Sequence, residues 1–277
     1  MTIKNLSDTI TLANGIQMPW LGLGTWLSNE GEEVRNAVRW ALNEGYRSID
    51  TARIYNNESG IGKAIKMSGM PREDIFLTTK LWNDDQRSGR VREAFEASLK
   101  RLGVDYVDLY LIHWAVEGKY INAWKQMEEI YKSGRAKAIG VSNFLIPHLE
   151  DIIADAEIVP MVNQVEFHPR LQQPDLQEYC KKHKIQFEAW SPIMKGRIFN
   201  ITELGVLAKK YGKNEVQITL RWIIQKGIVT IPKSVKLERI RSNADIFDFE
   251  LEPSDMALMD TLDRNERIGS DPMNVKY

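Results

Sequence analysis

The segment YVDLYLIH (Tyr106–His113) decides the fold of this chain. It is a short run of apolar, β-branched and aromatic residues without strict alternation, which is typical of a strand buried on both faces of a parallel sheet. Apolar residues then recur with helical spacing over Ile121–Lys132, and a second run, AKAIGVS (Ala136–Ser142), follows. This order predicts a β–α–β unit with parallel strands.

The same pattern recurs along most of the chain. The other expected strands are Met18–Thr25, Tyr46–Asp50, Asp74–Lys80, Pro160–Glu166, Ile185–Ser191 and Ile228–Ser234, and the first expected helices are Glu32–Asn43, Gly60–Met67 and Arg90–Leu102. Eight strand–helix units with short connections predict a closed (β/α)8 barrel, the TIM barrel of the α/β class. An open, doubly wound sheet is the main alternative. Because such barrels commonly take ~250 residues, we expect residues 1–277 to form a single domain.

Two segments fall outside this repeat. TITLANGIQM places Asn14-Gly15 between two alternating runs, which is a strong signal for a β-hairpin. In a barrel, we expect this N-terminal hairpin to plug the bottom. Pro253–Arg264 has the pattern of an extra C-terminal helix, and a polar tail follows it.

The composition excludes several classes of function. The 37 basic and 38 acidic residues leave a formal charge of -1, which gives no field to attract nucleic acid or an anionic membrane. No apolar run approaches the ~20 residues that span a bilayer, and the start MTIKNLSDTITL lacks the apolar part of a signal peptide. Cys180 is the only cysteine, so no intrachain disulfide is possible. We expect a cytoplasmic protein without nucleic-acid or membrane partners, and we expect a monomer.

Polar residues collect where the expected strands end. They are Asp50, Lys80, His113, Ser142, Asn143, Gln164, Glu166, Ser191, Lys233 and Ser234. Any one of them alone is explained by the need to end a strand in a polar residue. In a (β/α)8 barrel, however, all these ends lie on one rim, where active sites are built. Acidic and basic side chains that converge on this rim therefore indicate a site.

Four residues form a chemically coherent set: Asp50, Tyr55, Lys80 and His113. A phenol has an ordinary pKa of about 10, too high for efficient proton exchange at neutral pH. A lysine ammonium nearby favours the phenolate, a carboxylate keeps the lysine charged, and an imidazole donates a second hydrogen bond to the reacting oxygen. The set suits the protonation of a developing alkoxide. Taken alone, each residue also has a structural explanation: an Asp50–Lys80 ion pair, an interface tyrosine or a core histidine.

Seven motifs resemble those of the aldo-keto reductases. They are GYRSIDTARIYNNE (Gly45–Glu58), TTKLWNDDQ (Thr78–Gln86), DLYLIHW (Asp108–Trp114), IGVSNF (Ile139–Phe144), NQVEFHP (Asn163–Pro169), AWSP (Ala189–Pro192) and IPKS (Ile231–Ser234). The resemblance spans essentially the whole chain, in order and at compatible spacing. It is greatest to the compact microbial branch with glyoxal and 2,5-diketo-D-gluconate reductases and prostaglandin F synthase-like enzymes.

This resemblance implies roles for individual residues. Asp50, Tyr55, Lys80 and His113 would be the catalytic tetrad, with Tyr55 as general acid. The cofactor would be NADPH/NADP+. Its nicotinamide carboxamide would contact Ser142, Asn143 and Gln164, and its nicotinamide ring would lie on Trp190. The pyrophosphate would contact Ser191 and the Ile193–Arg197 loop, the adenosine 2′-phosphate would contact Lys233, Ser234 and Arg239 with Val235 beside them, and the adenine would contact Asn243.

Simple chemistry favours NADPH over NADH. Four basic residues crowd the last strand end and the helix after it: Lys233, Lys236, Arg239 and Arg241. A dianionic phosphate would be paired there, and a solvated basic helix face is the alternative. The chain departs from the family pattern at Ser242, where many relatives carry Glu near the adenine. It also departs at Ala115, where Pro is usual, which predicts a more mobile loop beside the pocket.

Motifs of other binding and catalytic classes are missing from the sequence. Leu27 stands where a dinucleotide-binding fingerprint would need its last glycine, so we interpret Gly22–Gly24 as close packing in a barrel strand. There is neither a G-x-S-x-G elbow nor a Walker A loop. The histidines and the cysteine have no zinc-ligand spacing, so we expect no metal. These residues are His113, His148, His168, His183 and Cys180.

Three tryptophans, Trp26, Trp82 and Trp114, fall just beyond strand ends. A single buried tryptophan is more often part of a core, but three on one rim predict an aromatic wall for a substrate. Only about seven residues separate His113 from the next helix, and the tail after Arg264 is brief. Both features predict a shallow, open pocket for small and varied carbonyl compounds.

We therefore predict NADPH-dependent reduction of small aldehydes, ketones or dicarbonyls to alcohols, with cofactor binding before substrate. Hydride passes to the carbonyl carbon while Tyr55 protonates the oxygen. Two alternatives stay open. One is a lyase in which Lys80 forms a Schiff base with a carbonyl substrate, and the other is a non-catalytic barrel that binds the cofactor as a sensor.

Overall fold

The computed structural model describes residues 3–274, and within them the expected strands form one eight-stranded parallel sheet. Its strands are β3 (Leu23–Gly24), β4 (Ser48–Asp50), β5 (Phe76–Leu81), β6 (Val107–Ile112), β7 (Ala136–Ser142), β8 (Val162–Glu166), β9 (Gln186–Trp190) and β10 (Val229–Thr230). Each strand pairs with its neighbours in the sequence. The sheet is therefore a series of consecutive β–α–β units.

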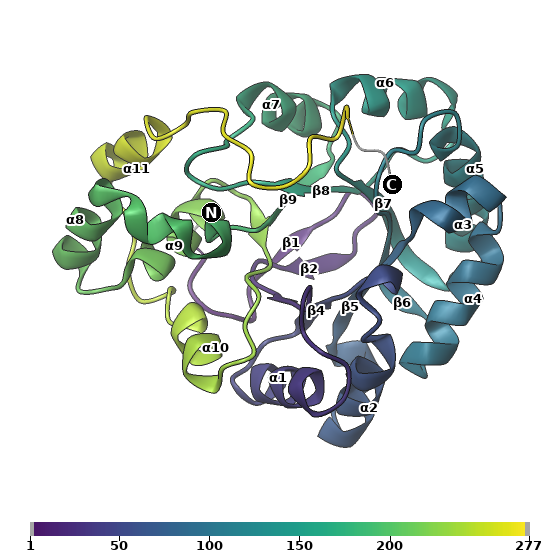
Figure 1. The fold of residues 1–277 in the computed structure, drawn as a ribbon, viewed down its shortest axis with the longest axis horizontal. Helices are drawn as coiled ribbons and strands as arrows, with labels where there is room; N and C mark the ends of the chain where they lie inside the picture. Colours follow the sequence, from purple (N-terminus) through teal and green to yellow (C-terminus); the bar gives the residue numbers. More distant parts are fainter. Residues whose placement is uncertain (1–2, 275–277) are drawn as a thin grey trace.

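The first and last strands of this sheet meet and close it into a barrel. Parallel bridges join Leu21 to Thr230 and Gly24 to Lys233, and the backbone amide of Gly22 donates to the Thr230 carbonyl at 2.9 Å. Figure 1 shows the helices arranged around the strands. The predicted (β/α)8 barrel is confirmed, and the alternative of an open, doubly wound sheet is excluded.

Glycines permit the close approach of strands at this closure. A Cβ atom on Gly24 would lie 2.6 Å from the Ile231 carbonyl oxygen, and one on Gly22 would lie 2.7 Å from Ser48 Oγ. Both distances are too short for any side chain. The interpretation of Gly22–Gly24 as close packing is confirmed.

Helices cover the outer face of the barrel. They are α1 (Glu32–Asn43), α2 (Glu58–Ser68), α4 (Val91–Leu102), α5 (Tyr120–Lys132), α6 (Ile146–Asp155), α7 (Pro174–Lys182), α9 (Glu215–Gln225) and α10 (Leu237–Ala244). In α5 the buried residues Ala123, Trp124, Met127 and Ile130 recur every three or four positions, which gives one apolar face toward the strands. All six residues of β5 are buried, as expected for a strand covered on both sides.

Several further elements depart from the regular repeat. They are α3 (Asn83–Ser88), α8 (Thr202–Tyr211), η1 (Arg53–Tyr55), η2 (Arg72–Asp74) and η3 (Met194–Asn200). The expected strand Met18–Thr25 is wrong in extent, because Gln17–Pro19 forms β2 of the hairpin and only Leu23–Gly24 joins the barrel. Pro19 has no N–H to donate to a central ladder, which favours a break at this point.

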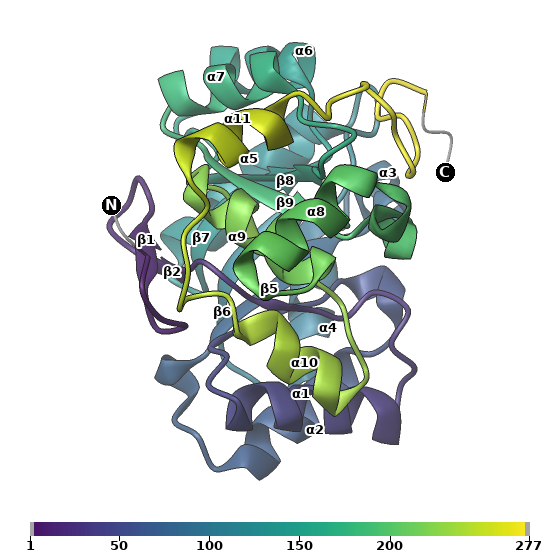
Figure 2. The same cartoon turned by 90° about the vertical axis from the view of Figure 1, so that its left-hand side faces the viewer.

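The N-terminal hairpin lies at the amino ends of the barrel strands. β1 (Thr9–Thr11) pairs with β2 in antiparallel register, and Gly15 in the turn has a φ of 89°, as the Asn14-Gly15 signal predicts. Asn14 Nδ2 donates to the carbonyl of Lys137, near the start of β7, at 2.8 Å. In Figure 2 the hairpin and the C-terminal segment lie on opposite sides of the barrel. The hairpin therefore covers the bottom, as predicted.

The extra C-terminal helix is present but shorter than expected. α11 spans Pro253–Asp260, where the sequence indicated Pro253–Arg264. After it the chain returns toward the rim, and the Arg264 amide donates to the Arg170 carbonyl at 3.1 Å. The residues at the two ends of the chain, 1–2 and 275–277, belong to the expected single domain but lie outside the described residues.

Two features of residues 3–274 concern membrane contact and metal binding. Each helix in this range is too short or too polar to cross a membrane. Within the same range, His, Cys, Asp and Glu side chains do not gather in groups of three or more that could hold a metal ion.

Candidate active site

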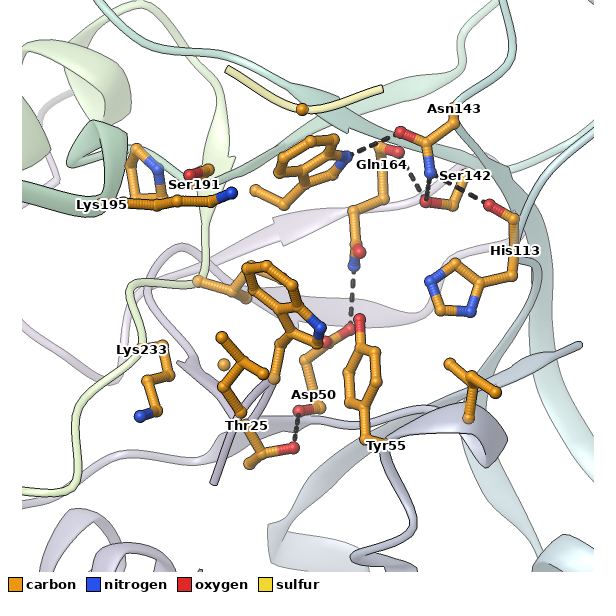
Figure 3. Close-up of a pocket in the computed structure, with 18 of the residues that line it drawn as sticks. Thr25, Asp50, Tyr55, His113, Ser142, Asn143, Gln164, Ser191, Lys195 and Lys233 are labelled. Atoms are coloured by element: carbon orange, nitrogen blue, oxygen red, sulfur yellow. Dashed lines mark hydrogen bonds between the residues drawn. The ribbon is translucent and has the colours of Figure 1, made fainter. Parts of the chain in front are cut away.

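A cavity of about 800 Å³ opens at the carboxyl ends of the strands, and every strand end contributes to its lining. The predicted site residues that line it are Asp50, Tyr55, His113, Ser142, Asn143, Gln164, Trp190, Ser191, Ile193, Lys233, Trp26, Trp82 and Trp114. Figure 3 shows these elements converging on one space. Lys80 lies in the barrel interior next to Asp50 rather than on the cavity wall.

Asp50 and Lys80 form an ion pair in the barrel interior. Lys80 Nζ lies 2.6 Å from Asp50 Oδ1 and 2.7 Å from Oδ2, and it also donates to the Thr51 carbonyl at 2.9 Å. The two side chains are 0% and 3% exposed. Burial acts to lower the pKa of Lys80, but the Asp50 carboxylate and Tyr55 outweigh it and raise that pKa above its ordinary value. Lys80 is therefore a fixed ammonium group at neutral pH.

Tyr55 ends the short helix η1 and places its hydroxyl group in the cavity. Figure 3 shows the phenol pointing into the space between Gln164 and His113, and Lys80 Nζ lies 5.1 Å from the centre of the Tyr55 ring. Burial raises the pKa of Tyr55 and the Lys80 ammonium lowers it, with a net rise. Lys80 acts in the direction that the sequence predicted, but burial is stronger, so the phenol holds its proton.

His113 follows β6 and faces Tyr55 and Trp82. The ring centres lie 5.6 Å from Tyr55 and 5.3 Å from Trp82, in edge-to-face contacts. Burial, followed by the charge of Lys80, lowers the pKa of His113 well below its ordinary value. The imidazole is therefore neutral and carries one N–H. Its Nδ1 atom is buried and without a hydrogen-bond partner among the described residues.

Ser142, Asn143 and Gln164 form a connected polar cluster at the ends of β7 and β8. Asn143 adopts a left-handed φ of 61°, and its Nδ2 donates to the His113 carbonyl at 3.0 Å and to Ser142 Oγ at 3.1 Å. Trp190 Nε1 donates to Asn143 Oδ1 at 2.9 Å. Gln164 Nε2 donates to Asp50 Oδ2 at 2.8 Å. Ser142 Oγ donates to the Gln164 carbonyl at 2.8 Å, so the cluster joins Trp190 to the buried ion pair. Figure 3 shows the bonds that connect Asn143, Ser142, Gln164 and Asp50.

The loop after β9 lines the cavity next to the residues that follow β3. Ser191, Met194 and Lys195 all have a positive φ, between 52° and 56°, which folds the loop tightly next to the rim. Lys195 Nζ lies 5.1 Å from the centre of the Trp26 ring. Lys195 and Trp26 both belong to the cavity wall.

The residues predicted for the adenosine part lie at β10 and α10. Lys233 lines the cavity, whereas Ser234, Val235, Arg239 and Asn243 do not. Arg239 is exposed and Asn243 is buried.

Two residues of α10 have partners that the sequence did not indicate. Arg241 pairs with Glu44 at 2.7 Å, so it does not belong with the free cations of the predicted basic cluster. Ser242 Oγ accepts from Asn214 Nδ2 at 3.1 Å.

The C-terminal tail adds a wall that the sequence did not indicate. Ile268, Gly269 and Ser270 line the cavity, and the buried Glu166 carboxylate accepts from the Ile268 amide at 2.7 Å and from the Gly269 amide at 3.1 Å. A Cβ atom on Gly269 would lie 2.5 Å from the Trp190 ring. The segment after Arg264 therefore reaches back over the rim.

Glu188, on β9, is a second residue that the sequence did not indicate. Its side chain is buried in the barrel interior and accepts from Gln164 Nε2 at 2.9 Å. The sequence does contain a sign of this residue, because Glu188 is a lone carboxyl group within the apolar run IQFEAWS (Ile185–Ser191). An unpaired charge is rarely tolerated in a core, so such a residue indicates a specific role.

Comparisons with known proteins agree with this geometry. The pattern of the Aldo/keto reductase family matches residues 20–264. The chain is 53% identical over 273 residues to the glyoxal reductase of Bacillus subtilis (strain 168), covering 99% of both proteins. It is 48% identical over 267 residues to the methylglyoxal reductase DkgA of Escherichia coli (strain K12), covering 95% of this chain and 96% of that protein.

A crystal structure of a Gox0644 mutant in complex with NADPH superposes on this chain with a TM-score of 0.93. The identity is 42%, and the match covers 97% of this chain and 98% of that one. Fold, motifs and whole-length identity agree, and this chain belongs to the aldo/keto reductase family.

Proposed function

We propose that this protein uses NADPH to reduce small aldehydes, ketones or dicarbonyls to alcohols, with Tyr55 as the general acid. The observation that carries the proposal is the placement of the Tyr55 hydroxyl in the cavity, in front of the buried Asp50–Lys80 pair and beside the neutral His113. The names of the two relatives, glyoxal reductase and methylglyoxal reductase, support small dicarbonyls as the substrate class.

The residues around the cavity suit a nicotinamide dinucleotide. Trp190 offers an aromatic face at the cavity wall, and the Ser142, Asn143 and Gln164 cluster offers amide and hydroxyl groups to a carboxamide. Lys233 on the wall, with the exposed Lys236 and Arg239 beyond it, offers cations to phosphate groups. The Gox0644 mutant is a relative solved with NADPH. When bound, this cofactor supplies the hydride.

The chain's own residues handle the proton. Tyr55 donates its proton to the substrate oxygen as negative charge develops there, and the neutral His113 donates a hydrogen bond to the same oxygen. Lys80, held as an ammonium group by Asp50, stabilises the phenolate that remains on Tyr55. Trp26, Trp82 and Trp114 form the apolar wall around the substrate.

The geometry disfavours the Schiff-base alternative. Lys80 is fully buried, is bound to both oxygens of Asp50 and does not line the cavity. Since Asp50 and Tyr55 raise its pKa against the effect of burial, it is not the free amine that attacks a carbonyl. The sensor alternative predicts cofactor binding without turnover, and the assay below distinguishes it.

Replacing Tyr55 with phenylalanine tests the proposal. The variant keeps the ring but loses the acidic hydroxyl, so kcat for methylglyoxal should fall by about 10²–10⁴-fold. NADPH affinity, measured by quenching of tryptophan fluorescence, should stay within about two-fold, because the loss of a general acid acts on the transition state rather than on binding. Retained turnover in the variant would remove Tyr55 from its assigned role. Wild-type protein that binds NADPH but reduces no carbonyl compound would favour the sensor.

A further inference from the structure

Glu188 is a buried carboxyl group that the mechanism above does not use. It lies on β9, is 1% exposed, and is directly opposite Gln164 in the parallel register of β8 and β9. Gln164 Nε2 donates to Glu188 Oε2 at 2.9 Å and to Asp50 Oδ2 at 2.8 Å. Asp50 in turn holds Lys80. Glu188, Gln164, Asp50 and Lys80 therefore form one hydrogen-bonded chain behind the cavity, which we call the interior relay.

The relay fixes the orientation of the Gln164 side chain. Its amide nitrogen has two hydrogens, and the two carboxyl groups accept both of them. A half-turn of the amide would place Gln164 Oε1 against the Asp50 carboxylate, which accepts from Lys80 Nζ and has no hydrogen of its own to donate. The nitrogen must therefore face Glu188 and Asp50, so Oε1 is left to accept a hydrogen bond from a ligand in the cavity that Gln164 lines.

The relay also places a titratable charge behind Tyr55. The nearby cation, Lys80 on β5, is already held by Asp50 through two hydrogen bonds. Burial, together with the negative charge of Asp50 on β4, raises the pKa of Glu188 to about 8, while Gln164 and Lys80 oppose this rise. Glu188 is therefore uncharged at neutral pH and becomes a second interior anion above about pH 8.

The charge on Glu188 acts on the proton donor through space. Burial has the largest effect on the pKa of Tyr55 and raises it, Lys80 lowers it, and the negative charges of Asp50 and Glu188 raise it further. Ionisation of Glu188 makes Tyr55 a weaker acid. Proton donation should therefore slow as the pH rises through about 8, well before the Tyr55 phenol itself ionises.

We propose that Glu188 is a positioning residue for the reduction: it orients the Gln164 amide toward its ligand, and its charge state sets how readily Tyr55 releases a proton. The proposal rests on the proposed function, in which Tyr55 protonates the substrate and Gln164 faces the nicotinamide carboxamide. Glu188 itself touches neither the substrate nor the cofactor.

Two substitutions separate the two effects. Glu188→Gln keeps an oxygen acceptor for Gln164 but cannot ionise, so the fall in kcat/KM for methylglyoxal near pH 8 should disappear. Glu188→Leu removes the acceptor as well, so NADPH affinity should drop by about five-fold, the effect of one hydrogen bond. In Glu188→Gln the affinity should stay close to that of the wild type.

Glu58→Gln is the matched control. Glu58 is also a buried glutamate, but it lies on α2, bonds to Thr79 and Arg101, and does not line the cavity. This variant should keep the fall near pH 8. A fall that disappears in both variants would reflect a general disturbance of the barrel and would overturn the role of Glu188.

A direct titration keeps the test independent of activity. In wild-type protein labelled with ¹³C at the glutamate carboxyl carbons, the signal that is missing from Glu188→Gln should titrate near pH 8. Titration at the ordinary pH for glutamate, or an unchanged pH profile in Glu188→Gln, would overturn the proposal. Wild-type protein that shows this titration but oxidises no NADPH at any pH would instead refute the proposed function.

Discussion

Replacing Lys80 with methionine should destabilise the fold strongly, because it leaves the Asp50 carboxylate buried without its cation. Methionine retains most of the aliphatic stem, so packing changes little. The wild-type ammonium group makes contacts of 2.6 and 2.7 Å to Asp50, and the side chains are 0% and 3% exposed. Breaking one side of such a pair costs about 3–5 kcal/mol. For a chain of this size, that lowers Tm by roughly 6–20 °C.

A double variant tests the cause of this loss. With Asp50→Asn added to Lys80→Met, no unpaired charge remains in the barrel interior, so about 1–3 kcal/mol should be regained. Urea unfolding at pH 7, followed by tryptophan fluorescence and circular dichroism, gives both values. Lys132→Met is the control, because Lys132 pairs with Glu157 at 2.7 Å but both side chains are largely exposed. Exposed pairs contribute little to stability.

Two results would refute this reasoning. One is an equal loss of stability in Lys80→Met and Lys132→Met, which would mean that burial of the pair is irrelevant. The other is a double variant less stable than Lys80→Met alone, which would mean that the unpaired carboxylate is not the source of the cost.

Three further predictions concern NADPH binding. Trp190→Phe keeps an aromatic ring but removes the N–H that donates to Asn143 Oδ1 at 2.9 Å. NADPH affinity should therefore fall roughly five-fold, the effect of one hydrogen bond. An unchanged Kd, measured by fluorescence, would contradict this prediction. Gly269→Ala would place a Cβ atom 2.5 Å from the Trp190 ring. Overpacking of this kind costs at least about 1 kcal/mol, so NADPH binding should weaken five-fold or more. A Kd equal to that of the wild type would show that residue 269 can move away from the ring at no cost. Arg239→Ala should weaken NADPH binding roughly 10–100-fold, which is the effect of losing one charged hydrogen bond, while NADH binding should change little. Equal losses of affinity for NADPH and NADH would exclude a contact between Arg239 and the 2′-phosphate.

The strands were predictable because burial on both faces leaves a mark in the sequence. β7 matches its expected bounds of Ala136–Ser142, and the close packing at Gly22–Gly24 was indicated by the glycines. Elements without apolar periodicity were not predictable. α3 consists of NDDQRS, and its helical form depends on its position between β5 and α4 rather than on an amphipathic pattern.

The polar rim was predictable for a similar reason, because polar residues at strand ends stand out against apolar runs. Contacts between distant segments were not. Glu166 receives the tail amides of Ile268 and Gly269 across more than a hundred residues, and no local pattern marks such a pairing. The contact of Glu188 with Gln164 was not predictable either, because the two residues lie on adjacent strands and are 24 positions apart in the sequence.

The position of Gln164 makes the two halves of the site interdependent. Its amide group binds Asp50, which holds Lys80 near the Tyr55 ring, and Gln164 also lines the cavity. A ligand that donates a hydrogen bond to Gln164 Oε1 would therefore act on the same hydrogen-bonded residues that lie near Tyr55. Because the interior relay is buried, its charges are poorly screened. A change in charge or hydrogen bonding at one end of the relay therefore alters the electrostatic potential at the other end. In the proposed mechanism, the cofactor site and Tyr55 are therefore coupled through Gln164 and Asp50, and substitutions on the two sides should not be additive.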